Sequence, residues 1–321
     1  MITRRHFLQR TLPAAAAGAL TACEQAQPPT RFILPNRPLA VVTTTVQAAD
    51  LLGEVGGEAV TVKSLIPLMS NPHLWQPTAA ELSTVHTADV FVLSGLGLEA
   101  KFNENLDTLR NTGLAVGVLS DVLTEAEIIR PDGPAAPPDP HFWMNASLWA
   151  KAAGRAAEVL AAASPPAAAY FQDRAHEYST QLEDLHRLMQ GRFKELAPRA
   201  RFLISSHDSL RYLAEAHGMS IRSMWNARGE DYPEEETKKT AAWVKEHQVK
   251  LLFRENLVGG ENLLARMHDL SLPSSKVIIS LSLTQAGTLM AGLSEGLDVG
   301  KYKSALKYTC EMIYSTLFTA K

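Results

Sequence analysis

The stretch PPAAAYFQDRAHEYSTQLEDLHRLMQGRFKEL, residues 165–196, predicts one long helix near the middle of the chain. Proline is favoured in a first helical turn, where its missing N–H leaves no hydrogen bond unmade, and the next glycine is Gly191. At 1.5 Å per residue, about 30 residues span roughly 45 Å, the length of a domain. We therefore expect a helix that links two lobes; the alternative is a surface helix within one domain. Its apolar residues recur at helical spacing: Tyr170, Ala175, Tyr178, Leu182, Leu185 and Leu188.

The sequence on both sides of this helix alternates apolar, β-rich runs with amphipathic stretches. Strands are expected at 39–46, 59–65, 89–94 and 114–119, and again at 201–205, 220–224, 250–253 and 276–281, with helices such as 237–247 and 262–270 among them. Such alternation is typical of parallel sheets. The predicted fold is α/β, with two lobes that each hold a four-stranded parallel sheet and flanking helices, joined by one long backbone helix. The expected boundaries are 38–164 for the N-terminal lobe, 165–197 for the linking helix and 198–321 for the C-terminal lobe.

Composition excludes several classes of protein. The 321 residues are 46% hydrophobic and 20% charged with a net charge of -3, which is typical of a globular protein and gives no support to nucleic-acid binding. Two cysteines, Cys23 and Cys310, exclude a disulfide framework and a four-thiolate zinc site. The body of the chain has no apolar run long enough for a polytopic membrane protein.

The first 23 residues have the pattern of an export signal. Arg4, Arg5 and Arg10 precede the apolar run 12–20, and no acid lies among them. The segment TRRHFLQ, residues 3–9, resembles the twin-arginine consensus, and LTAC, residues 20–23, resembles a bacterial lipobox. We expect lipidation of Cys23, a tether over 24–37, and a protein anchored in the periplasm or on the outer face of the cytoplasmic membrane. The alternative is an ordinary signal anchor with an incidental cysteine.

One pentapeptide pattern, Asn or Asp followed by Pro-His-apolar-Trp, occurs twice, at 71–75 and 139–143. The proline keeps the residue before it extended, which fixes the approach of His73 and His141. The segment TAAE, residues 78–81, reads as a capping box that starts a helix after the first motif. Chance repetition of so specific a pattern is improbable, so both histidines are candidate ligands.

His207 is the third candidate, because it ends an expected strand, where open α/β sheets place their ligands. Three neutral imidazoles and a carboxylate or water form a tetrahedral metal site. The sequence thus indicates a metal site between the lobes; the alternative is two aromatic-flanked turns and an unrelated histidine. The other histidines of the body are expected not to be ligands. His176 and His186 lie roughly 80° apart around the long helix rather than on one line. The remaining four lie in polar helical contexts: His86, His217, His247 and His268.

The chain resembles the metal-binding solute-binding lipoproteins of ABC transporters, the cluster A-I family that takes up zinc or manganese. The resemblance rests on the signal and lipobox, PHLWQPTAAEL at 72–82, ADVFVLSGLGLE at 88–99, DPHFW at 139–143, the long helix, and SHD at 206–208. It implies two four-stranded lobes bridged by a helix, with one divalent metal ion held in the interlobe cleft by His73, His141 and His207. It also implies an ABC transporter permease as partner, a monomer, and a binding protein rather than an enzyme. A histidine in the third place resembles the zinc-binding members, whereas manganese favours more oxygen ligands.

The chain departs from the family at the fourth ligand, since Leu281 stands near the place where many relatives carry an Asp. Glu255 is the expected substitute, followed by Asp298 or Glu295, and a water is the remaining alternative. Other functions left open are a manganese- or iron-binding member of the family, a protein for an organic or chelated ligand, an adhesin, and a zinc hydrolase. Against a hydrolase, HExxH is absent and no Glu neighbours a candidate ligand. Trp75 and Trp143 are expected to wall the cleft.

Overall fold

The computed structural model describes residues 35–67, 70–99, 113–131, 133–249, 251–254, 277–279 and 301–319, together with 102, 109, 265, 267 and 268. All of these belong to one compact unit, Phe32–Lys321. The predicted export signal, Cys23 and most of the tether lie outside the described residues, as do Glu255, Leu281, Glu295 and Asp298. Among the described helices, none is long and apolar enough to cross a bilayer.

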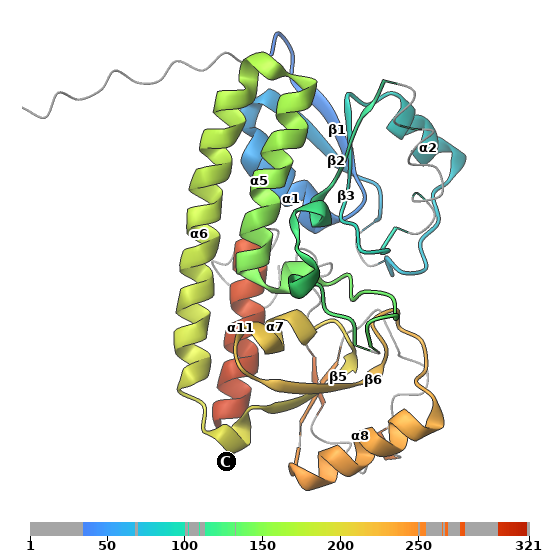
Figure 1. Cartoon of the computed structure of the whole chain (residues 1–321), viewed down its shortest axis with the longest axis vertical. Helices are drawn as coiled ribbons and strands as arrows, with labels where there is room; N and C mark the ends of the chain where they lie inside the picture. The colour runs from blue at the N-terminus through green and yellow to red at the C-terminus, as the bar shows by residue number, and fades with distance from the viewer. Residues whose placement is uncertain are drawn as a thin grey trace, which may run out of the picture. The chain divides into compact units, whose positions relative to one another are not determined.

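The N-terminal lobe, defined here as the part that carries β1 to β4, is built on a four-stranded parallel sheet (Figure 1). Its strands are β1 (Leu39–Thr43), β2 (Val60–Ser64), β3 (Val90–Leu93) and β4 (Ala115–Val118), in the order β2-β1-β3-β4. Successive side chains of a strand point to opposite faces. Val41, Val90 and Val92 accordingly face the core with α1 (Val46–Gly56) and α5 (Ala146–Ala163), whereas Phe91 faces the side of α2 (Ala79–His86).

The C-terminal lobe, the part that carries β5 to β8, repeats this plan. Its strands are β5 (Phe202–His207), β6 (Ser220–Trp225), β7 (Leu252–Arg254) and β8 (Val277–Ile279), all parallel, in the order β6-β5-β7-β8. The short helix α7 (Arg211–Ala216) follows β5, and α8 (Glu234–Glu246) packs its Val244 against Ile204 on one face of the sheet. The predicted fold class, two lobes with four-stranded parallel sheets, is confirmed.

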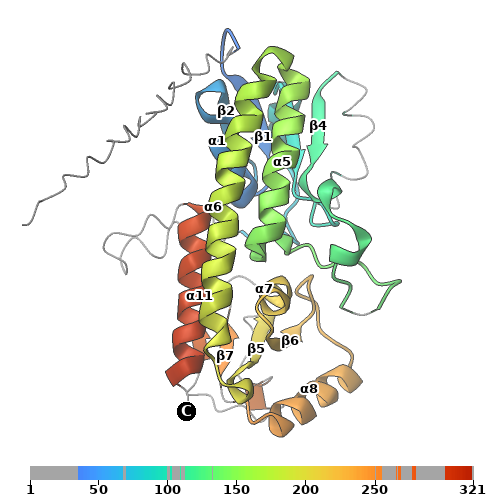
Figure 2. The same ribbon diagram turned by 60° about the vertical axis from the view of Figure 1, so that its left-hand side comes forward.

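The linking helix is α6 (Ala168–Lys194), preceded by a 3-10 turn at Pro165–Ala167. It lies beside α5 and the C-terminal helix α11 (Tyr302–Thr319), as Figures 1 and 2 show from two sides. Its buried side is formed by Phe171, Ala175, Tyr178, Leu182, Leu185, Met189 and Phe193. Leu188, one of the apolar residues at helical spacing, is 49% exposed, because Met189, four residues after Leu185, holds the core position.

A second connection between the lobes comes from the start of α11. Lys301 Nζ lies 3.2 Å from Asp50 and 2.9 Å from Glu54, both on α1. The Tyr302 hydroxyl, 3% exposed as a residue, donates to the carbonyl of Trp143 at 2.5 Å. The contacts of α11 with α1 and with Trp143 therefore connect the lobes in addition to the long helix α6.

His217, at the end of α7, is buried rather than in the polar context that its sequence suggested. Its ring stacks on Phe193 of α6 at 4.9 Å between centroids, and His186 lies 5.5 Å away. Burial, and then the neighbouring His186, lower the pKa of His217 from 6.5 to about 4. The neutral ring thus packs between the linking helix and the C-terminal lobe.

We expect this histidine to make the metal-free protein sensitive to acid. A histidine whose folded pKa is lowered stabilises the fold above pH 6.5, and this stability is lost as the pH falls toward 4. The expected loss is about 3 kcal/mol, from 1.36 kcal/mol per pKa unit. His217→Phe keeps the stack but cannot titrate, so urea unfolding at pH 7 and pH 4.5 should show a smaller fall in stability for the variant. Equal falls in both proteins would contradict the prediction.

Candidate metal centre

The two repeated motifs form the same local turn. In each, the side-chain oxygen of the first residue accepts the backbone N–H of the histidine two positions later: Asn71 Oδ1 from His73 and Asp139 Oδ1 from His141, both at 2.9 Å. This is the hydrogen bond of an Asx turn, and the proline between the two residues restricts its backbone. The pattern Asn/Asp-Pro-His therefore fixes the backbone conformation at the histidine, and with it the direction in which the side chain leaves the backbone.

The structure brings the three candidate histidines together. His73 precedes α2, which begins with the predicted capping box of Thr78 and Glu81; His141 precedes the short helix Phe142–Met144, and His207 is the last residue of β5. Their candidate ligand atoms all lie within 4.8 Å of one another, and their ring centroids are 4.8 to 5.1 Å apart. His141 and His207 are buried and His73 is half-buried. Two candidate ligands thus come from the N-terminal lobe and one from the C-terminal lobe.

The spacing of the nitrogens fits a metal ion. Zinc–imidazole bonds of about 2.0 to 2.1 Å in a tetrahedron place neighbouring ligand atoms about 3.3 Å apart. His73 Nε2 and His141 Nε2 are 3.2 Å apart. The described residues contain one group of at least three His, Cys, Asp or Glu side chains that could hold a metal ion, and it is this one.

Asp139 fixes the tautomer of His141. Its Oδ1 lies 2.6 Å from His141 Nδ1, and a carboxylate can only accept, so Nδ1 carries the hydrogen and the neutral ring turns the lone pair of Nε2 toward the other histidines. Asp139 is fully buried, and this burial raises its pKa to about 7, against the opposing effects of the His141 N–H, Arg211 and His207. The Trp143 ring stands edge-on to His141 at 5.3 Å, whereas Trp75 stacks on Phe102 instead of meeting a candidate ligand.

We expect Asp139→Asn to weaken metal binding by about 10- to 100-fold, the usual effect of losing the partner that orients a histidine ligand. The amide has the same shape but lacks the charge that makes His141 a better electron donor. Competitive titration with a chelator at pH 8 measures the change. Asp121→Asn, an exchange of the same kind at a half-exposed carboxylate that faces Arg155, is the control and should leave affinity unchanged. An equal effect of both exchanges would contradict the positioning role.

Electrostatics keep His73 neutral. Burial, followed by the nearby His141, His207 and Arg228, holds the pKa of His73 well below its usual 6.5. Metal ions bind the neutral imidazole, so protons compete with the metal at His73 only at a pH below the ordinary histidine range.

The C-terminal lobe supports His207 through its neighbours. His207 Nε2 lies 3.1 Å from the carbonyl oxygen of Ala227, which can only accept, so Nε2 donates. Asp208 does not cap the next helix, since α7 has no side-chain cap. Instead, Asp208 Oδ2 accepts from Arg211 and, at 3.2 Å, from the Tyr232 hydroxyl. Burial raises the pKa of Asp208.

Tyr212 of α7 ties the lobes together next to the site. Its hydroxyl donates to the carbonyl of Asp139 at 3.3 Å and accepts the N–H of Ile129 at 3.1 Å. The C-terminal lobe thus holds the loop that carries His141. Sequence reasoning missed this contact, because a tyrosine in a short helix gives no sign of a partner 73 residues away.

Comparison with known proteins identifies the family of the chain. The family model described as "Zinc-uptake complex component A periplasmic" matches residues 41–292. The chain belongs to this family. The match begins in β1 and extends through the linking helix and all three candidate histidines.

Similar proteins match most of the length of this family member. It is 25% identical over 269 residues to the manganese-binding lipoprotein MntA of Bacillus subtilis, covering 84% of this chain and 87% of that one. It is 26% identical over 273 residues to the zinc-binding protein TroA of Treponema pallidum, covering 83% and 85%. The solved structure of that TroA superposes with a TM-score of 0.75 at 24% identity over 87% of this chain and 99% of the other, which shows the shared fold.

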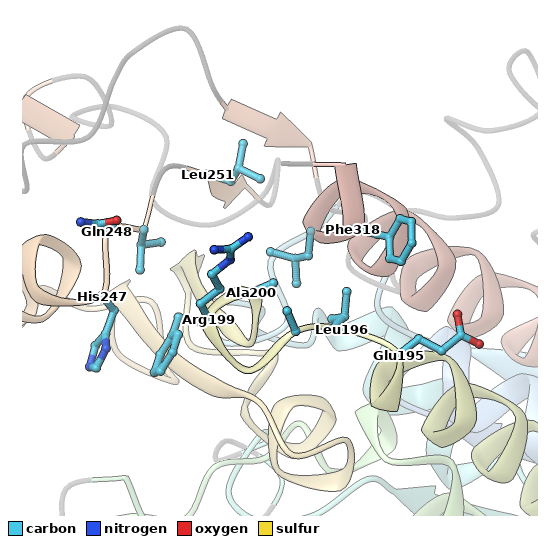
Figure 3. Close-up of a pocket in the computed structure, with 12 residues that line it drawn as sticks. Glu195, Leu196, Arg199, Ala200, His247, Gln248, Leu251 and Phe318 are labelled. Carbon is cyan, nitrogen blue, oxygen red and sulfur yellow. The ribbon is translucent and has the colours of Figure 1, made fainter. Parts of the chain in front are cut away.

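A separate hollow in this family member lies at the far end of the C-terminal lobe (Figure 3). It is lined by the segment after α6, by residues after α8 and by the end of α11; Glu195, Arg199, His247, Leu251 and Phe318 are among them. The His247 ring stacks on Phe202 at 4.0 Å, as an aromatic packing residue. The mixed lining brings no set of metal-binding side chains together, so the histidine cluster remains the candidate site.

Proposed function

We propose that this protein captures a divalent metal ion outside the cytoplasm and delivers it to an ABC transporter permease. The observation that carries the proposal is the meeting of three histidine side chains from two lobes, with two Nε2 atoms 3.2 Å apart. Family membership supports the transport role. The manganese-binding and zinc-binding relatives support a metal as the cargo.

Zinc is the favoured cargo over manganese. Imidazole nitrogen suits zinc, whereas manganese prefers carboxylate, carbonyl and water oxygens. We assign His73, His141 and His207 as ligands, with the fourth position open to Glu255, Asp298, Glu295 or another oxygen. A manganese- or iron-binding member of the family is the alternative.

We propose binding without covalent chemistry. A zinc hydrolase needs a general base that can reach a metal-bound water and a substrate. The carboxylates next to the histidines, Asp139 and Asp208, are both fully buried and accept hydrogen bonds from His141 and from Arg211. Each therefore has a supporting role in the described part of the site.

The remaining proposals concern location and assembly. The twin-arginine pattern and the lipobox support export in the folded state and a lipid anchor on Cys23 at the outer face of the bacterial cytoplasmic membrane. We propose a monomer with lobes at 38–164 and 198–321 around the linking helix 165–197. Radiolabelled fatty acid incorporated by the full chain and lost in Cys23→Ala tests the anchor.

Metal titration tests the function. The body from Glu24 onward, stripped with a chelator, is titrated with zinc and manganese beside a His73→Ala, His141→Ala, His207→Ala triple variant. We expect one ion per chain, zinc bound more tightly than manganese, and loss of both in the triple variant. Zinc binding no stronger than that of the triple variant would mean that the Pro-His turns are structural.

A further inference from the structure

We propose that the backbone carbonyl oxygen of Ala227 is the fourth ligand of the bound metal ion. The inference rests on the proposed function, because it assumes that the three histidines hold a metal. Three nitrogens leave one position of a tetrahedron to fill. Among the residues described, no fourth His, Cys, Asp or Glu joins the group.

The carbonyl oxygen of Ala227 stands at the distance from His207 that a ligand would have. It is 3.1 Å from His207 Nε2, and the two Nε2 atoms of His73 and His141 are 3.2 Å apart. Both separations match an edge of about 3.3 Å in a tetrahedral zinc site. Ala227 is buried at 8% exposure, so the oxygen lies inside the protein next to the histidine cluster.

The backbone fixes this carbonyl in place. Trp225 at the end of β6 pairs with His207 at the end of β5, so Ala227, two residues after Trp225, follows the strand end that lies beside His207. Asn226 then closes a tight turn: its Oδ1 accepts the N–H groups of Arg228 at 2.9 Å and Glu230 at 3.0 Å, and its own N–H donates to the Glu230 carbonyl at 2.9 Å.

Two further features close the same turn. The N–H of Gly229 donates to the Asn226 carbonyl at 2.9 Å, and the φ of Gly229 is 78°, in the region that glycine favours. Trp225 and Asp231 pair across the base of the turn. The carbonyl of Ala227 is thus preorganised, and no chain movement is needed to offer it.

Metal binding would exchange the hydrogen between His207 Nε2 and the Ala227 oxygen for the metal ion. In the metal-free protein the hydrogen on His207 Nε2 lies between this nitrogen and the Ala227 oxygen. When the ion binds, Nε2 gives this hydrogen up to solvent and Nδ1 takes up a proton from solvent, so the ring stays neutral and the lone pairs of Nε2 and of the Ala227 oxygen are both available to the ion. Carbonyl oxygen is an acceptable ligand for manganese as well as zinc, so this fourth ligand also explains how a three-histidine site could hold either ion.

Selective labelling tests the proposal on the mature chain. Carbonyl-13C alanine and 15N arginine label the three Ala-Arg steps, at 200–201, 227–228 and 265–266, and Arg228→Lys identifies the Ala227 signal. With 113Cd as the probe metal, we expect scalar coupling between 113Cd and the Ala227 carbonyl carbon. With zinc we expect a downfield shift of that carbon, because a dication polarises the carbonyl more than an N–H does. The Ala200 carbon is the internal control and should not move.

A positioning variant gives a second readout. Asn226→Ala loosens the turn and should lower zinc affinity by about tenfold, an effect of the size expected for outer-shell partners. Asn226→Asp combined with Glu230→Gln keeps an acceptor for both N–H groups without placing two carboxylates together, and should restore it.

Three outcomes would overturn the proposal. One is an upfield shift of the Ala227 carbon with zinc together with a loss of affinity of ~100-fold in Glu255→Gln, Glu295→Gln or Asp298→Asn, which would assign the ligand to a carboxylate. Another is the same upfield shift with no effect of those variants, which would assign it to water. The third is zinc binding no stronger than that of the triple histidine variant, which removes the proposed function and this inference together.

Discussion

Replacing His207 by alanine is expected to lower zinc affinity by about 100- to 1,000-fold. Structural zinc sites with four ligands are worth about 10 to 16 kcal/mol, so one ligand contributes roughly 2.5 to 4 kcal/mol. Each 1.4 kcal/mol corresponds to a factor of ten in affinity. His207 is also the candidate ligand that comes from the C-terminal lobe, so its loss should leave His73 and His141 as the remaining candidate histidines.

His207→Gln separates the ligand role from packing. His207 is 1% exposed, so alanine leaves a cavity and an unpaired carbonyl at Ala227, whereas glutamine fills the space and can still donate to it. Isothermal titration with zinc, after far-UV circular dichroism has shown a native spectrum, measures the effect. His247→Ala, at a histidine stacked on Phe202 away from the cluster, is the control. An affinity within threefold of wild type in both His207 variants would remove this residue from the site.

Replacing Glu99 by alanine is expected to lower the free energy of unfolding by about 3 to 6 kcal/mol. Glu99, 4% exposed, accepts the Thr44 hydroxyl at 2.5 Å and the N–H groups of Ser94 at 2.8 Å and Gly95 at 3.0 Å. Each buried donor left without an acceptor costs about 1 to 3 kcal/mol. The carboxylate joins the ends of β1 and β3, and its loss should loosen the N-terminal lobe.

Graded variants check the origin of this effect. Glu99→Gln keeps one acceptor oxygen and should fall between wild type and Glu99→Ala. Glu58→Ala, at an exposed position, should stay within about 0.5 kcal/mol of wild type. Urea unfolding of the metal-free protein at pH 7 gives all three values. A loss for Glu99→Ala no larger than that for Glu58→Ala would show that the three hydrogen bonds are not needed.

Much of the fold could be predicted from the sequence, for reasons that particular elements make plain. Strands of parallel sheets are buried on both faces, so runs such as Val90–Leu93 are apolar throughout and easy to locate. The linking helix is marked by two prolines at its start and by the long absence of glycine. Its exact buried side could not be predicted, since both Leu188 and Met189 lie at helical spacing from Leu185 and only packing against α11 and α5 decides between them.

Some residues of the candidate site could also be predicted from the sequence, whereas their contacts could not. His73 and His141 could be found because a repeated turn carries its own local signal, and His207 because strand ends hold ligands in this kind of sheet. Asp139 was visible as the first residue of its motif, but its bond to the Nδ1 of His141 depends on a side-chain rotamer. The carbonyl of Ala227 had no sequence signal at all, because its place depends on the pairing of Trp225 with His207.

The tie between α11 and α1 bears on the order in which the protein can be completed during synthesis. Asp50 of the N-terminal lobe emerges from the ribosome early, yet its partners Lys301 and Tyr302 follow some 250 residues later. Domains begin to fold as they emerge, N-terminal part first. Until residues 301–319 have been made, Asp50 and Glu54 therefore lack their ion pairs with Lys301, and the Trp143 carbonyl lacks the Tyr302 hydroxyl. For a protein that is predicted to leave the cytoplasm already folded, we expect this late contact to be in place before export begins.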